Sequence, residues 1–188
     1  ARQVFPEAEV VELPIADGGE GLVQIILQNL DGKLRIISVQ DPLGRPIEAS
    51  YALLDSGAAI IEMAAAAGLP LLQKGELDPM KTSTVGVGEL ILDAIKIGAN
   101  PILVGLGGSA TVDGGVGASS ALGIRFLDQW GGVGTSGGGL QKIMEVDLCG
   151  LHEIKYSGKL VFLTDVNNPL CGPNGAAAIF GPQKGASP

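Results

Sequence analysis

The sequence predicts an α/β fold built on a mostly parallel sheet, and three observations lead to that prediction. Apolar segments of strand length alternate at least three times with glycine-rich loops and then with segments of helical periodicity. Apolar residues make up 46% of the 188 residues and aromatic residues only 4%, so the core must consist of Ala, Val, Leu and Ile. Such a composition suits buried strands and closely packed helices.

The N-terminal third is expected to contain a strand, a helix and then a pair of antiparallel strands. The segments 33–40 and 47–54 alternate apolar and polar residues, and the turn-rich sequence DPLGRP separates them. The expected elements are a strand at 9–14, a helix at 20–30 and strands at 33–40 and 47–54, after which a turn at 55–57 leads into the apolar segment 58–63.

The clearest helix of the remaining chain covers residues 83–99, where an apolar stripe recurs at helical spacing and Gly98 supplies the C-terminal stop. A buried strand that ends in glycines follows it. The glycine stretch 131–139 is predicted to be flexible. The other expected elements are strands at 101–108, 124–128 and 159–166 and a helix at 115–123.

Both ends of the sequence predict a truncated chain. There is no initiator Met, and the opening ARQVFP is typical of the end of a helix. The last two residues, Ser187 and Pro188, form a pair that usually starts a helix. We therefore expect further chain at both ends.

Charge and cysteine content exclude several classes of function. The net charge of −8 disfavours nucleic-acid binding, because an acidic surface repels phosphate backbones. Cys149 and Cys171 belong to no metal-binding pattern and are expected to be free thiols in a reducing cytoplasm, and His152 is expected at the surface. No apolar run approaches the roughly 20 residues of a membrane helix, so no membrane contact is expected.

Three loops that follow apolar strands combine an acidic residue with several glycines. They cover residues 16–21, 107–115 and 164–175. The carboxyl ends of strands in an open α/β sheet form its ligand crevice, so these loops are expected to meet. Glycine lets backbone N–H groups approach an oxyanion, and Asp113 has the oxygen chemistry that Mg²⁺ prefers. The pattern predicts a phosphate site.

Two alternatives remain open at this stage. The glycines are also typical of turns that let helices pack, and Asp17 and Asp113 are also suitable as helix caps. In addition, Gly105, Gly107 and Ala110 match the dinucleotide fingerprint, with Asp128 at the spacing of a ribose-binding acid. That second alternative predicts a nicotinamide- or flavin-dependent oxidoreductase.

Long motifs spread over the whole chain resemble one family. LPIADGGEG, DPLGRPIEA, TSTVGVGELILDA, GLGGSATVDGGVGASSALG and DVNNPLCGPNGAAAIFGPQKGA occur in the order typical of bacterial glycerate kinases of the glycerate-2-kinase type. The resemblance implies transfer of the γ-phosphoryl group of ATP to D-glycerate to give 2-phosphoglycerate. It also implies a Rossmann-like domain that is split around an inserted α/β domain, with residues 1–32 in the split domain and 33–188 in the inserted one.

The chain departs from that family pattern at two positions. Val112 stands where the family usually has Asn, and Asn167 where it usually has Thr. Phosphorylation of the 3-hydroxyl of glycerate and a binding module without catalytic activity remain alternatives. D-Glycerate and ATP are the expected partners, and a homo-oligomer is left open.

Site roles follow from the phosphoryl transfer that the resemblance implies. Asp165 is the candidate general base, Lys184 offsets the charge of the substrate, and Mg²⁺ is expected at Asp17 and Asp113. Glu62 and Glu89 are expected only to cap or orient. The remaining expected residues are Gly107, Gly108, Ser109, Thr111 and Gly114 for the ATP phosphates, with Asp17 (also a catalytic candidate), Gly18, Gly19 and Asn168 for glycerate.

Overall fold

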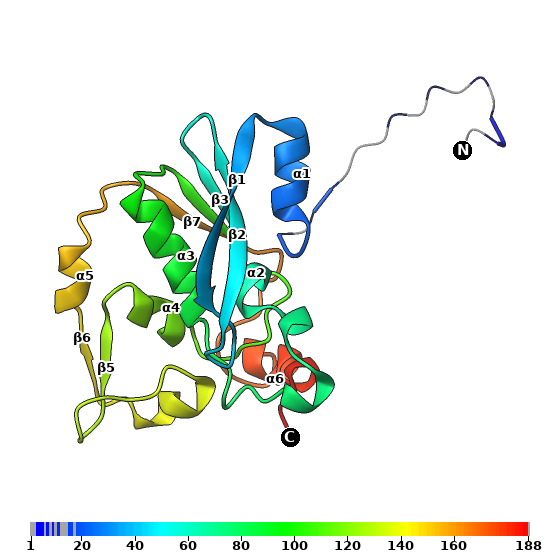
Figure 1. Cartoon of the computed structure of the whole chain (residues 1–188). Helices are drawn as coiled ribbons and strands as arrows, with labels where there is room; N and C mark the ends of the chain where they lie inside the picture. Colours follow the sequence, from blue (N-terminus) through cyan, green and yellow to red (C-terminus); the bar gives the residue numbers. More distant parts are fainter. Residues whose placement is uncertain are drawn as a thin grey trace.

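The computed structural model of the chain describes residues 3–5, 7, 9, 11, 15–16 and 18–187. Within these residues, five strands form the main sheet in the order β1-β2-β3-β4-β7 (Figure 1). Their bounds are Gly32–Gln40 for β1, Pro46–Leu54 for β2, Ala59–Glu62 for β3, Ile102–Gly105 for β4 and Leu160–Leu163 for β7. The α/β class that the sequence predicts is confirmed.

The main sheet is mixed, and the lengths of its connections explain why. β1 pairs antiparallel with β2, and β2 pairs antiparallel with β3, through short turns that reverse the chain. β3, β4 and β7 are parallel, because long connections that contain helices return the chain to the starting edge. Parallel pairing is thus confined to one half of the main sheet. The sequence, by contrast, predicts a mostly parallel sheet.

Two apolar cores cover the two faces of this sheet. On one face Tyr51 and Ile61 pack with Leu90 of α3 (Val85–Lys96). On the other face Ile60 packs with Val23 of α1 (Leu22–Asn29). Neighbouring positions of one strand enter opposite cores, as the two-residue period of a strand requires. The result is a layer of helix on each side of the sheet, as Figure 1 shows.

The remaining elements of the described chain are short. Several of them surround the carboxyl ends of the parallel strands. The α-helices are α2 (Ala64–Ala67), α4 (Val116–Ala121), α5 (Cys149–Glu153) and α6 (Ala176–Phe180), and the 3₁₀ turns are η1 (Leu69–Leu71), η2 (Lys74–Glu76), η3 (Gly137–Lys142) and η4 (Pro182–Lys184). A separate two-stranded sheet pairs β5 (Arg125–Leu127) with β6 (Glu145–Asp147).

Most elements expected from the sequence are present, with bounds that agree within a few residues. The helix at 83–99 ends where predicted, and Gly98 has the left-handed φ of 79° that a terminating glycine adopts. A strand is present at Arg125–Leu127, as expected from 124–128, but it belongs to the small two-stranded sheet. The segment 131–139 is also more structured than predicted, since Gly138 N donates to Met80 O over 3.0 Å. The strand at 9–14 and the helix end at 1–6 lie partly outside the described residues, and residues 3–5, 9 and 11, which are described, are neither helix nor strand.

Helix α1 packs directly on the main sheet. Leu22 and Val23 share a core with Ala52 and Leu54 of β2. The division of the chain at residue 32 into two domains remains a prediction. In the part of the chain that the structure describes, no helix is long and apolar enough to span a membrane.

Candidate active site at the carboxyl ends of the parallel strands

Two glycine turns lie against each other where β4 ends. Gly107 N donates to Gly18 O over 3.3 Å. A Cβ atom on Gly107 would lie 2.6 Å from Gly19 Cα, and one on Gly105 would lie 2.2 Å from Gly18 O. Real Cβ atoms do not approach other atoms so closely, so these glycines allow the backbones to touch.

The turn after β7 joins the same region. Leu106 N donates to Leu163 O over 3.0 Å, which places Thr164 and Asp165 beside the glycine turns. Three loops that the sequence predicts to meet therefore do so at one edge of the sheet. Asp17 lies outside the described residues.

Lys184 connects the C-terminal segment to the glycine-rich loop. Its Nζ donates to Ser109 Oγ over 2.7 Å and to Thr111 O over 2.8 Å. The residue is only 8% exposed, although lysine side chains are ordinarily at the surface. Burial lowers the pKa of Lys184, and the carboxylate of Asp113 opposes that shift.

Asp113 anchors the starts of two helices. Its Oδ2 accepts hydrogen bonds from Thr84 N at 2.8 Å, Thr84 Oγ1 at 2.7 Å and Gly117 N at 3.2 Å, and its Oδ1 accepts from Gly115 N at 3.0 Å. The residue is 2% exposed. These contacts favour the capping role that the sequence analysis left open, and the metal role remains a prediction. Among the described residues, no group of three or more His, Cys, Asp or Glu is placed to hold a metal ion.

Two adjacent cavities open on either side of Lys184. The smaller one, of about 330 Å³, is lined by Gly107, Gly108 and Asp165, among others. The larger one, of about 670 Å³, is lined by Gly114 and by Thr111, with a mostly apolar wall. The two cavities have five lining residues in common, namely Leu106, Ser109, Ala176, Phe180 and Lys184.

The expected substrate residues do not all line these cavities. Asp165 is exposed and lines the smaller cavity. Asn168 lines neither, and its Nδ2 donates to Asn174 O over 3.0 Å within its own loop. Gly18 and Gly19 are buried beneath the loop that follows β4 and act here through their close backbone contact.

Two acidic residues stabilise the surroundings of the site. Glu62 Oε1 accepts from Val23 N at 2.5 Å, which holds the start of α1 to the end of β3. Glu89 Oε2 accepts from Gln40 N at 2.7 Å. Both contacts agree with the capping and orienting roles expected for these residues.

Cavity residues absent from the sequence-based set include Phe180, Thr164 and Gln183. Gln183 directly precedes Lys184 in the motif GPQKG, and this adjacency was the one available signal. Phe180 gave no such signal, because its contribution depends on how α6 lies over the loop after β4.

The dinucleotide alternative loses its structural basis. The fingerprint requires a helix to begin within the glycine loop and the acid to follow the neighbouring strand. Here the next helix begins at Val116. Asp128 follows β5 of the small sheet, where its Oδ1 accepts from Trp130 N at 2.7 Å. Asp128 thus organises its own turn.

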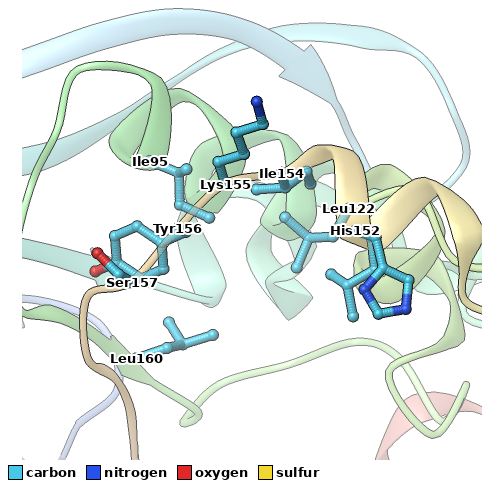
Figure 2. Close-up of a pocket in the computed structure, with 9 residues that line it drawn as sticks. Ile95, Leu122, His152, Ile154, Lys155, Tyr156, Ser157 and Leu160 are labelled. Carbon is cyan, nitrogen blue, oxygen red and sulfur yellow. The ribbon is translucent and has the colours of Figure 1, made fainter.

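A third cavity lies apart from these residues. Figure 2 shows its lining, which includes Ile95, Leu122, Tyr156 and Leu160 from α3, from the residue after α4, and from the segment leading into and beginning β7. Its volume is about 560 Å³, and His152 is exposed at its edge, as expected for a surface histidine. It shares no lining residue with the two cavities beside Lys184.

These features define an α/β protein with a ligand site where parallel strands end. Residues 1–188 match the model of the glycerate kinase family, and the chain belongs to that family. It is 46% identical over 188 residues to a glycerate kinase of Bacillus subtilis (strain 168), which covers 99% of the chain and 49% of that protein. It is 45% identical to the glycerate 2-kinase of Escherichia coli (strain K12), with 99% and 49% covered.

A solved structure supports the same assignment. A Salmonella typhimurium LT2 protein, provisionally named glycerate kinase 2, superposes with a TM-score of 0.89 at 42% identity, covering 100% of this chain and 51% of that one. The chain therefore spans about half the length of the relatives it matches.

Proposed function

We propose that the protein carrying this chain transfers the γ-phosphoryl group of ATP to the 2-hydroxyl of D-glycerate. Membership of the glycerate kinase family supports the class of reaction. The observation that carries the proposal for this chain is the meeting of the loops after β4 and β7 around a buried lysine. Phosphoryl transfer depends on such positioning and on neutralisation of charge.

The loop after β4 has the properties of a phosphate-binding loop. Among the described residues, the N–H groups of Gly108 and Ser109 have no hydrogen-bond acceptor. The ammonium group of Lys184 lies beside them, held by Ser109 Oγ and Thr111 O. Two backbone donors next to a fixed positive charge would stabilise the oxygens of a transferring phosphoryl group.

Asp165 is proposed as the general base. It is exposed in the smaller cavity, and none of the hydrogen bonds within the described residues occupies its carboxylate. A free carboxylate beside the loop is suited to accept the proton of the glycerate hydroxyl as the new O–P bond forms. Lys184 would then offset the negative charge of the phosphoryl group.

Magnesium fits this site as a partner of the nucleotide. Mg²⁺ in kinases is held by phosphates and waters with only one or two carboxylates, so a complete protein cage is not required. Asp17, outside the described residues, is the proposed carboxylate. The ion would neutralise charge on the phosphates. The two exposed free cysteines support the proposed placement in a reducing compartment such as the cytoplasm.

The experiment is an assay of the full-length protein with ATP, Mg²⁺ and D-glycerate. We expect ADP formation that depends on glycerate, and ³¹P NMR should identify 2-phosphoglycerate as the product. Asp165→Asn should lower kcat by about 10²–10⁴-fold, the usual contribution of a general base, with little change in ATP binding. Near-normal turnover of this variant would remove Asp165 from the mechanism. A 3-phosphoglycerate product would overturn the proposed regiochemistry.

A further inference from the structure

We infer that the two cavities beside Lys184 divide the substrates between them: the larger holds the nucleoside of the phosphate donor, and the smaller holds the hydroxy acid. The phosphoryl group would cross between them at Ser109 and Lys184. This inference rests on the proposed kinase function and adds an arrangement of the two substrates within it.

Size and polarity distinguish the two cavities. The larger one, of about 670 Å³, has apolar side chains in its wall, among them Met63, Leu140, Leu170 and Phe180. Such a volume and lining are typical of sites for flat, partly apolar ligands. A purine nucleoside has this character, since its base buries two apolar faces and presents polar atoms only at its edges.

The smaller cavity has a different chemistry. Its volume is about 330 Å³, and its wall includes Thr164, Asp165 and Gln183. A three-carbon hydroxy acid is polar over its whole length and needs hydrogen-bond partners more than apolar surface. It also needs a base at its hydroxyl, and Asp165 lines this cavity only.

Charge argues against the reverse arrangement. A triphosphate carries several negative charges and glycerate only one, so the carboxylate of Asp165 in the smaller cavity would repel a triphosphate more strongly than it repels glycerate. Among the described residues that line the larger cavity, Asp113 is the one carboxylate, and its oxygens accept four hydrogen bonds from the protein. The larger cavity therefore tolerates the highly charged phosphates of the donor better.

The junction between the cavities is suited to transfer. Lys184 and Ser109 line both cavities and are the polar residues that the two linings share, so a phosphate chain that extends from the larger cavity into the smaller one would pass beside them. An ammonium group has three N–H donors, and Ser109 Oγ and Thr111 O accept two of them. The third remains for a phosphoryl oxygen. The cavity of Figure 2 lacks both residues and so cannot present a nucleotide to this junction.

The chain contains its own probe of this arrangement. Cys171 is exposed and lines the larger cavity. Cys149 is also exposed, belongs to α5 and lines neither cavity, so it serves as an internal control. Its thiol pKa is raised by the neighbouring Asp147, so each cysteine is compared only with itself.

The experiment measures alkylation of each cysteine by iodoacetamide in the full-length protein, with peptide mass spectrometry as the readout. A non-hydrolysable ATP analogue and adenosine should each slow alkylation of Cys171 by about fivefold or more, because a pocket buries most of the surface of its ligand and the ligand then shields residues of the wall. D-Glycerate alone should leave Cys171 nearly unchanged. Cys149 should react at the same rate throughout.

Two results would overturn the arrangement: protection of Cys171 by glycerate alone, or no protection by either adenine compound at saturating concentration. Because this readout needs no turnover, it separates failure of the arrangement from failure of the kinase proposal. A protein that turns over glycerate while Cys171 stays unprotected keeps the function and loses the arrangement.

A pair of steric variants gives a second measurement. Ala177 lines only the larger cavity and Val166 only the smaller. Ala177→Trp should raise the KM for ATP by about tenfold with little effect on the KM for glycerate, since an inserted indole fills the space a ligand needs. Val166→Trp should do the reverse. The inference would be contradicted if Ala177→Trp raised the KM for glycerate and Val166→Trp raised the KM for ATP.

Discussion

Lys184 Nζ lies 2.7 Å from Ser109 Oγ, although 75 positions separate the two residues in the sequence. The contact fixes the C-terminal segment against the loop that follows β4 and places a positive charge between the two cavities. A buried ammonium group is costly unless polar atoms surround it, and here Thr111 O and the Asp113 carboxylate contribute. The geometry therefore favours a function that requires the charge.

Replacement of the lysine tests that requirement. Lys184→Met keeps most of the length of the side chain and removes the charge, and we expect kcat/KM to fall by about 10²–10³-fold, as for other groups that stabilise transition-state charge. Ser109→Ala removes one hydrogen bond of the lysine and should cost about tenfold or less. Steady-state kinetics of both variants give the comparison. Equal losses of kcat/KM in the two variants would mean that the hydrogen bond between Lys184 and Ser109 matters more than the charge of Lys184.

The pH dependence of activity gives an independent check on the same residue. Burial lowers the pKa of Lys184 from its ordinary value of 10.5, so the ammonium form should be lost at a lower pH than for an exposed lysine. We expect kcat/KM to decline on the alkaline side before pH 10.5 is reached. Lys184→Arg should move that decline to higher pH if it retains activity, because a guanidinium stays protonated. A profile unchanged in this variant would assign the decline to another group.

Local patterns in the sequence predicted the loops of the site, whereas contacts between distant segments could not be read from it. The loops after β4 and β7 meet because the carboxyl ends of parallel strands lie at one edge of a sheet, and that rule needs only the strands. The burial of Lys184 depends on how the segment 176–184 folds back over the loop. Asp128 shows the opposite error: its spacing fitted a fingerprint, but β5 pairs with β6 outside the main sheet.

Because the two glycine turns approach each other closely, we predict that substitution of Gly107 will lower both stability and activity. A Cβ atom there would lie 2.6 Å from Gly19 Cα, so Gly107→Ala must push the turns apart at a cost of about 1–3 kcal/mol. We expect kcat/KM to fall about tenfold or more, because the loop that contacts the substrate is displaced. Gly132→Ala is the matched control: nothing lies within 4 Å of its Cβ, and stability should change by less than about 0.5 kcal/mol. Equal changes of stability and of kcat/KM in the two variants would contradict the close contact between the turns.

Asp113 offers a test between anchoring and metal binding. Asp113→Asn replaces a carboxylate that accepts four hydrogen bonds, so one N–H group will face an amide donor. We expect a loss of about 2–3 kcal/mol in the free energy of unfolding, measured by urea denaturation. The Mg²⁺ concentration for half-maximal activity should stay the same. Normal stability together with a raised Mg²⁺ requirement would restore the metal role.

A cluster of polar side chains between α3 and the main sheet should make stability depend on pH. Asp93 on α3 accepts hydrogen bonds from Arg35 Nε at 2.6 Å, Arg35 Nη2 at 2.8 Å and Tyr51 Oη at 2.7 Å. The hydrogen bond from Arg35 is the main cause of a pKa of Asp93 below its ordinary value of 3.8.

A carboxyl group whose pKa is lower in the folded state stabilises the protein at pH values above its pKa in the unfolded state. This stabilisation is lost as the pH falls through its pKa in the folded state. Asp93→Asn should therefore lower the free energy of unfolding by about 2 kcal/mol near pH 7, where the carboxylate is charged. The difference from the unsubstituted protein should shrink below pH 3.8, as Asp93 takes up a proton. Urea denaturation across this range measures it. A difference that stays constant with pH would show that the negative charge of Asp93 contributes nothing to stability, and would contradict this prediction.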